Sequence, residues 1–126
     1  MPKILYVDDE DDIREIAEMA LGLDPSFEIR SAASGREGLE VARCFSPDLI
    51  MLDVMMPGMD GPSTFSAARA DPDLGHVPVV FITARTQTHQ VAELMALGAR
   101  GVIPKPFDPM TLAAQVSRLL DDEGNR

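Results

Sequence analysis

The chain has 126 residues, of which 45% are hydrophobic and 25% are charged, the proportions of an ordinary globular protein. Its formal net charge of −10 disfavours direct binding to nucleic acid, because an acidic surface repels phosphate backbones. The single cysteine, Cys44, excludes an internal disulfide, and no apolar run approaches the roughly 18 residues that a membrane span needs. We therefore expect one domain over residues 1–126 with no membrane association.

The first residues pass directly into an apolar strand pattern. They lack the charged segment, apolar segment and cleavage site of a signal peptide. We expect a cytoplasmic protein on this basis. Cys44 falls within a helical apolar pattern and is expected at the core or its boundary.

Short apolar runs predict five strands. Uninterrupted runs bounded by turn residues are typical of strands buried on both faces. An alternating run and a run that contains a proline favour edge strands. In chain order the predicted strands are Ile4–Val7, Phe27–Ala32 (alternating), Leu49–Asp53, Val79–Thr83 and Gly101–Pro104 (with proline).

A helical pattern follows each strand. The first is expected to end before Asp24, which precedes a proline, and the second to begin with a capping box at Ser34. The third is expected to begin at Gly61 and the fifth at Pro109, after an Asp108 cap. The polar tail 121–126 is expected to fray. The predicted buried stripes include Ile13, Ile16, Ala17, Ala20 and Leu21 in the first helix, and Val91, Leu94 and Met95 in the fourth.

Strict alternation of five strands and five helices predicts an α/β fold. Such alternation favours a parallel sheet that is covered on both faces through right-handed crossovers. With the two edge strands placed as above, we predict a flavodoxin-like, doubly wound (βα)5 architecture with strand order 2-1-3-4-5.

Polar residues lie at the carboxyl ends of the predicted strands. Asp8 and Asp9 follow the first strand, Asp53 ends the third, Thr83 ends the fourth and Lys105 follows the fifth. Because these ends share one rim of a parallel sheet, three carboxylates should converge there. Like charges about 4 Å apart repel by about 4 kcal/mol at an effective dielectric of 20, so the cluster needs a proton or a cation.

An all-oxygen ligand set of this kind favours a hard ion such as Mg²⁺. A cation, the Lys105 ammonium and the Thr83 hydroxyl together make a receptor for phosphoryl oxygens. Asp53 could then act as a nucleophile that forms an acyl phosphate.

This arrangement resembles the receiver domain of two-component response regulators, of the type seen in the chemotaxis regulator. The resemblance covers essentially the whole chain. Each motif alone is weak, but their order and spacing are specific. The matching residues are Asp8-Asp9, Asp53 followed by Met56-Pro57-Gly58-Met59-Asp60-Gly61, Thr83-Ala84, and Lys105-Pro106-Phe107.

The resemblance implies a phosphorylation-dependent switch in which Asp53 accepts a phosphoryl group from the phosphohistidine of a histidine kinase or a phosphotransfer protein. It implies that Mg²⁺ is bound by Asp9, Asp53 and the Met55 carbonyl, with Asp8 acting through a water. Lys105 and Thr83 would contact the phosphoryl oxygens, and the Lys105–Pro106 bond is expected to be cis.

The resemblance also implies that phosphorylation changes the surface of the fourth helix, fifth strand and fifth helix, which a downstream effector protein reads. Thr83, Ala84, Arg85 and Val102 lie at positions that govern switching or phosphoryl lifetime. Val102 departs from the family, in which many members carry Tyr or Phe there. Arg85 is expected to screen or contact the phosphate.

Three alternatives remain at the level of sequence. A phosphohydrolase that uses an aspartyl phosphate would want an aspartate two residues after the nucleophile, where this chain has Met55. A flavin or nucleotide carrier would want a phosphate-cradling first loop, whereas Asp8 and Asp9 repel phosphate. A degenerate receiver is disfavoured because the five key positions are intact. The sequence leaves open the kinase, the output partner, a phosphorylation-linked homodimer, and whether the domain stands alone or belongs to a longer protein.

Overall fold

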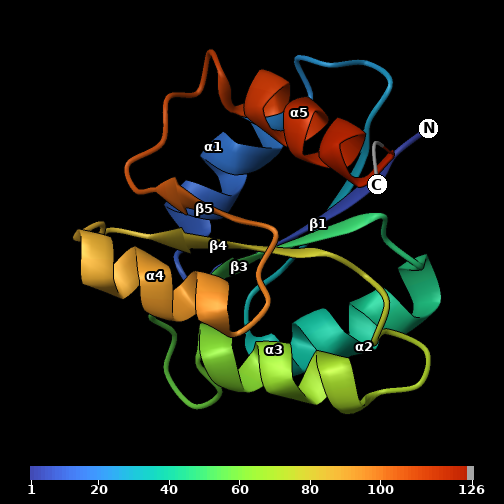
Figure 1. Ribbon diagram of the computed structural model, residues 1–126. Helices are drawn as coiled ribbons and strands as arrows, with labels where there is room; N and C mark the ends of the chain where they lie inside the picture. Colours follow the sequence, from blue (N-terminus) through green and yellow to red (C-terminus); the bar gives the residue numbers. More distant parts are fainter. Residues whose placement is uncertain (125–126) are drawn as a thin grey trace.

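The computed structural model describes the backbone of residues 1–124 and the side chains of residues 1–121. Five strands alternate with five helices along the chain (Figure 1). Their bounds are β1 Lys3–Val7, α1 Asp11–Leu21, β2 Glu28–Ala32, α2 Gly35–Phe45, β3 Leu49–Asp53, α3 Gly61–Ala70, β4 Val79–Thr83, α4 Thr88–Ala96, β5 Gly101–Pro104 and α5 Leu112–Gly124.

The strands form one parallel sheet in the order β2-β1-β3-β4-β5, which confirms the predicted topology. Helices α1 and α5 cover one face of the sheet, and α2, α3 and α4 cover the other (Figure 1). The register pairs Val7 with Leu52, Asp53 with Ile82, and Thr83 with Pro104. The carboxyl ends of β1, β3, β4 and β5 therefore lie along one rim.

The strands that read as continuous apolar runs are the buried ones. Every residue of β3 and β4 is buried, whereas β2 and β5 at the two edges are partly exposed. In β1, Leu5 and Val7 join the core under α2 and α3, while Ile4 and Tyr6 join the core under α1 and α5. This alternation turns Tyr6 toward the same face as the polar residue two positions later.

Three side chains that the helical patterns place at the core or its boundary are exposed. Ile16 is 42% exposed and Met95 is 43% exposed, and Cys44 is also on the surface. The helices present a narrower apolar face to the sheet than the sequence pattern suggests. Ala17 and Leu94, one residue away from Ile16 and Met95, are buried instead.

Helix α5 differs from the predictions at both of its ends. Helix α5 begins at Leu112 rather than Pro109, because the Asp108 carbonyl accepts the N–H groups of Thr111 and Leu112 in a preceding turn. Helix α1 ends at Leu21, before Asp24 as predicted. The Ser34 hydroxyl caps α2 as predicted, but the return bond of the capping box is made to Ala33.

At its carboxyl end, α5 continues to Gly124 instead of fraying from residue 121. Residues 125–126 of the predicted tail lie outside the described residues. Among the helices that the structure describes, none has the length and apolar character needed to span a membrane.

Candidate phosphoacceptor site

Asp53 lies at the end of the central strand β3 and is 3% exposed. Burial and the nearby Asp8 carboxylate raise the pKa of Asp53 from its usual 3.8 to about 6, against the lowering effect of Lys105 and of a hydrogen bond from the Met55 backbone. Its carboxylate therefore sits where ionisation costs free energy unless positive charge is added. This is the electrostatic condition that a cation would relieve.

Asp8 is fully buried at the end of β1. Its Oδ1 accepts the backbone N–H of Glu10 at 2.9 Å, and its Oδ2 accepts the Tyr6 hydroxyl at 3.1 Å. The Tyr6 ring packs edge-on against Phe107, with 6.4 Å between ring centroids. Burial, and then the charge of Asp8, raise the pKa of Tyr6 above its usual value, so this hydroxyl remains a donor. Asp8 is thus held in one orientation.

Lys105 brings the positive charge to the rim. Its peptide bond to Pro106 is cis, as predicted. Its Nζ lies 3.0 Å from Asp8 Oδ2, 3.2 Å from Glu10 Oε1 and 3.4 Å from Asp53 Oδ2. Burial opposes the ammonium charge, but the hydrogen bond to Asp8 and the charge of Asp53 outweigh it and raise the pKa of Lys105. The Lys105 ammonium therefore forms ion pairs with three carboxylates.

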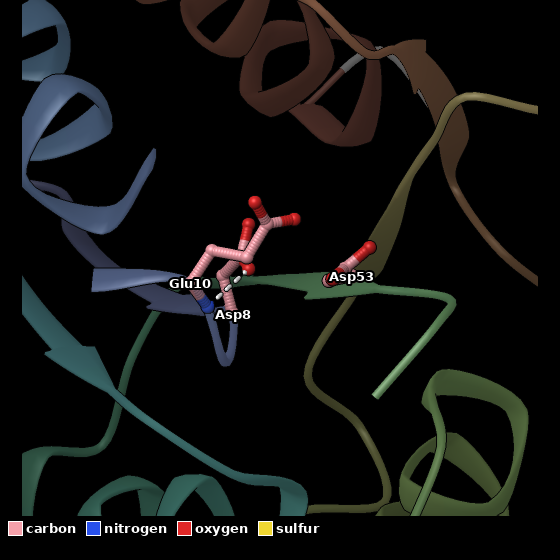
Figure 2. Close-up of side chains that lie close together, drawn as sticks. All are labelled: Asp8, Glu10 and Asp53. Carbon is pink, nitrogen blue, oxygen red and sulfur yellow. Dashed lines mark hydrogen bonds between the residues drawn. The ribbon is translucent and has the colours of Figure 1, made fainter. Parts of the chain in front are cut away.

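Asp8, Glu10 and Asp53 each offer a carboxylate oxygen, and these oxygens lie within 4.8 Å of one another. Figure 2 shows the Asp8 and Glu10 side chains beside each other after β1, with Asp53 across from them at the end of β3. Oxygen donors of this kind suit Mg²⁺. Asp9, a predicted metal ligand, is exposed and lies outside this group, while Met55 contributes its backbone N–H to Asp53.

The predicted switch residues lie beyond β4. Thr83 is buried, and its Oγ1 accepts the Arg85 N–H at 3.0 Å. Ala84 and Arg85 are exposed. Thr83 and Arg85 line a pocket of about 290 Å³ between β4, α3 and α4. Val102 is half-buried against the core under α4, without an aromatic ring to swing outward.

The loop after Asp53 is shaped by glycine and by a helix cap. A Cβ at Gly61 would lie 2.6 Å from the Asp53 carbonyl oxygen, so only glycine allows this close return of the chain. Gly58 has φ +75°, which also favours glycine. The Asp60 carboxylate accepts the Ser63 N–H at 2.8 Å and caps α3. These features return the chain close to the acceptor.

An apolar groove adjoins the site on the α1 side. Its exposed side chains come from α1, from Leu23 just after it and from the turn before α5. A second pocket joins it to Lys105 and is lined mainly by apolar residues. The groove is lined by Ile16, Met19, Ala20, Leu23, Pro109 and Met110.

Asp8, Asp53 and Lys105 lie together as the sequence predicts, but the site has two further participants that the sequence does not predict. Neither Glu10 nor Tyr6 is among the site residues predicted from the sequence, and Tyr6 lies within the predicted strand Ile4–Val7. The period of the strand would have indicated Tyr6, because it lies two residues before Asp8 and shares its face. No comparable signal in the sequence points to the contact between Glu10 and Lys105.

A family model described as the response regulator receiver domain matches residues 4–117. The transcriptional regulatory protein CseB of Streptomyces coelicolor is 38% identical over 117 residues, which cover 93% of this chain and 48% of that protein. The DNA-binding response regulator MtrA of Mycobacterium bovis is 37% identical over 124 residues, with 96% and 53% covered. The chain thus spans about half the length of the curated relatives it matches.

The chemotaxis response regulator CheY4 of Vibrio cholerae has a similar solved structure. It superposes with a TM-score of 0.85 at 36% identity, covering 94% of this chain and 98% of that one. A receiver domain from a Francisella response regulator superposes with a TM-score of 0.86 at 26% identity, covering 98% of this chain and 99% of that one.

Proposed function

The chain belongs to the response regulator receiver domain family, and on that premise we propose that it is a phosphorylation-dependent switch whose acceptor is Asp53. Receiver domains are signalling domains of two-component systems. The observation that carries the assignment of Asp53 is its position at the end of β3, within 3.4 Å of Lys105 and beside two further carboxylates. A nucleophile, a fixed ammonium and further carboxylate oxygens lie on one rim.

The proposed step is transfer of a phosphoryl group from a phosphohistidine to an Asp53 carboxylate oxygen. The new bond joins that oxygen to phosphorus, and the phosphorus–nitrogen bond breaks. The imidazole leaves with the electron pair of that bond and takes up a proton from its surroundings. Lys105 offers its ammonium to the phosphoryl oxygens, and the Thr83 hydroxyl donates to one of them while its oxygen still accepts the Arg85 N–H.

The chemistry of the donor set suits a bound Mg²⁺, which would offset the negative charge that gathers on Asp53 and the phosphoryl group. We propose that Asp9, Asp53 and the Met55 carbonyl hold it, with Asp8 acting through a water. The fixed orientation of Asp8 supports this role. The Asp9 side chain is exposed and can therefore turn toward the cation.

The output is proposed to be a change on the surface formed by α4, β5 and α5. Movement of Thr83 toward the phosphoryl group would pull the Arg85 backbone with it, because the two are hydrogen bonded at 3.0 Å. Arg85 would then screen or contact the phosphate. With Val102 in place of an aromatic residue, the Thr83 loop and α4 would carry the signal to a downstream effector protein or to an output segment of a longer protein.

Histidine kinases and phosphotransfer proteins are the proposed donors. The apolar groove that begins at Ile16 opens toward Lys105, so a donor helix seated on it would present its phosphohistidine to the rim. The exposed Met19 and Met110 side chains would supply adaptable contact area. Analytical ultracentrifugation of the phosphorylated chain would test whether phosphorylation also drives a homodimer.

The test uses acetyl phosphate as a small phosphodonor. Mass spectrometry should show one added phosphoryl group with Mg²⁺ present and none with EDTA. Asp53→Asn should remain unmodified, and Asp60→Asn, an exposed carboxylate of the same loop, should behave as the wild type. Persistence of the adduct in Asp53→Asn would move the acceptor elsewhere.

A further inference from the structure

We propose that Glu10 is a positioning residue whose carboxylate serves as a displaceable counter-anion for Lys105, holding the ammonium at the rim until a phosphoryl group takes its place. The inference rests on the proposed function, because it concerns what Lys105 contacts before Asp53 is phosphorylated. It assigns a role to the residue at the N-cap position of α1.

The Lys105 ammonium has three anionic partners, of which two are buried and one is exposed. The side chains of Asp8 and Asp53 are buried and fixed by the strands that carry them. The Glu10 side chain is 60% exposed and lies 3.2 Å from Lys105 Nζ at the outer side of the site. Glu10 is therefore the partner that can leave without disturbing the sheet.

The backbone of Glu10 is anchored even though its side chain is exposed. Its N–H donates to Asp8 Oδ1 at 2.9 Å, and its carbonyl accepts the Arg14 N–H at 3.0 Å in the first turn of α1. The carboxylate is thus tethered close to Lys105 and returns to it at a high effective concentration.

Glu10 is also not occupied as a helix cap. It holds the N-cap position of α1, yet its side chain makes no capping hydrogen bond. Asp11 and Asp12 supply the acidic charge in the first turn of that helix. The Glu10 side chain instead reaches across to Lys105, 95 residues away in the sequence.

Phosphorylation would bring competing oxygens to the same ammonium. A phosphoryl group on Asp53 carries more negative charge than the carboxylate it replaces and several strong acceptor oxygens. Repulsion between this group and Glu10 favours departure of the Glu10 side chain into solvent. The Glu10–Lys105 contact therefore modestly opposes phosphorylation of Asp53. It forms again once the acyl phosphate is hydrolysed.

The matched pair of variants is Glu10→Gln and Asp12→Asn. Both remove one negative charge from the same segment, but Asp12 is exposed and makes no ion pair with Lys105 among the described residues. Phosphorylation by acetyl phosphate is measured at saturating Mg²⁺ as a function of donor concentration. Glu10→Gln should lower the half-saturating donor concentration about two- to fivefold, the range for a partly exposed ion pair, with the maximal rate little changed.

Two readouts separate this role from a purely structural one. Beryllofluoride, a phosphoryl mimic, should bind Glu10→Gln more tightly by a similar factor, and Asp12→Asn should match the wild type. In the protein without phosphate, the side-chain NMR resonance of Lys105 Nζ should shift in Glu10→Gln and not in Asp12→Asn.

Other outcomes overturn the inference. A tenfold or larger loss of Mg²⁺ affinity in Glu10→Gln would assign Glu10 to the cation rather than to Lys105. Equal effects in both variants would indicate the general charge of the segment, and no effect in either would remove the role. If the wild type takes up no phosphoryl group, the proposed function fails and this inference fails with it; if the wild type is phosphorylated normally and Glu10→Gln matches it, only the inference fails.

Discussion

Replacing Asp53 with Asn should stabilise the protein in the absence of a divalent cation. The pKa of Asp53 is raised from 3.8 to about 6, so the folded state holds a proton at this carboxyl more tightly than the unfolded state does. The stability that this protonation contributes is fully present below about pH 4 and is lost as the pH rises through about 6. Above that, the ionised carboxylate destabilises the folded protein relative to a neutral side chain.

The size of the effect follows from the shift in pKa. The rise of this pKa from 3.8 to about 6 corresponds to at most about 3 kcal/mol of free energy. We expect Asp53→Asn to raise the free energy of unfolding by about 1–3 kcal/mol at about pH 7.5 and by roughly half as much at about pH 5. Lys105 keeps Asp8 and Glu10 as partners in the variant, so its ammonium is not left uncompensated.

Urea denaturation in EDTA at several pH values measures this effect. Asp73→Asn is the matched control, because it makes the same change at an exposed turn residue and should alter the free energy of unfolding by no more than about 0.5 kcal/mol. Saturating Mg²⁺ should reduce the difference in the free energy of unfolding between the wild type and Asp53→Asn, because it stabilises the wild type more. Destabilisation by Asp53→Asn at neutral pH, or a gain that does not change with pH, would refute the reasoning.

Three further substitutions examine other parts of the site. Tyr6→Phe keeps the ring against Phe107 but removes the hydrogen bond to Asp8. Urea denaturation should therefore show a loss of about 1–2 kcal/mol in the free energy of unfolding, and an unchanged value would mean that this hydrogen bond makes no net contribution to stability. Gly61→Ala should lower the free energy of unfolding by about 2 kcal/mol or more, because its Cβ would lie 2.6 Å from a backbone oxygen, and wild-type thermal stability would contradict this. Arg85→Ala should shorten the half-life of the phosphorylated protein at least about twofold, because the guanidinium no longer screens the phosphate, and an unchanged or longer half-life would reject that role.

Most of the fold could be predicted because burial and periodicity are local properties of the sequence. The continuous apolar runs of β3 and β4 are the strands covered on both faces, and the alternating Glu28–Ala32 segment is an edge strand. Helix faces were less predictable. Whether Ile16 or Met95 is buried depends on how each helix is rotated against the sheet, and that rotation is set by packing rather than by spacing.

The candidate site, like the fold, was predictable only in part. The sequence by itself determined that Asp8, Asp53, Thr83 and Lys105 lie on one rim, because each ends or follows a parallel strand and the strand order places those ends together. It also determined the class of chemistry, since carboxylates beside an ammonium and a hydroxyl suit a cation and a phosphoryl group.

Only the tertiary structure decided which side chains contact one another at that rim. The contact between Glu10 and Lys105 joins residues 95 positions apart, and Asp9 turns to solvent although it is adjacent to both Asp8 and Glu10 in the chain. The hydrogen bond from Tyr6 to Asp8 likewise requires a buried hydroxyl with a carboxylate in reach. Periodicity fixes the face on which a residue lies, but the directions of side chains at the end of a strand depend on neighbours brought in from distant parts of the chain.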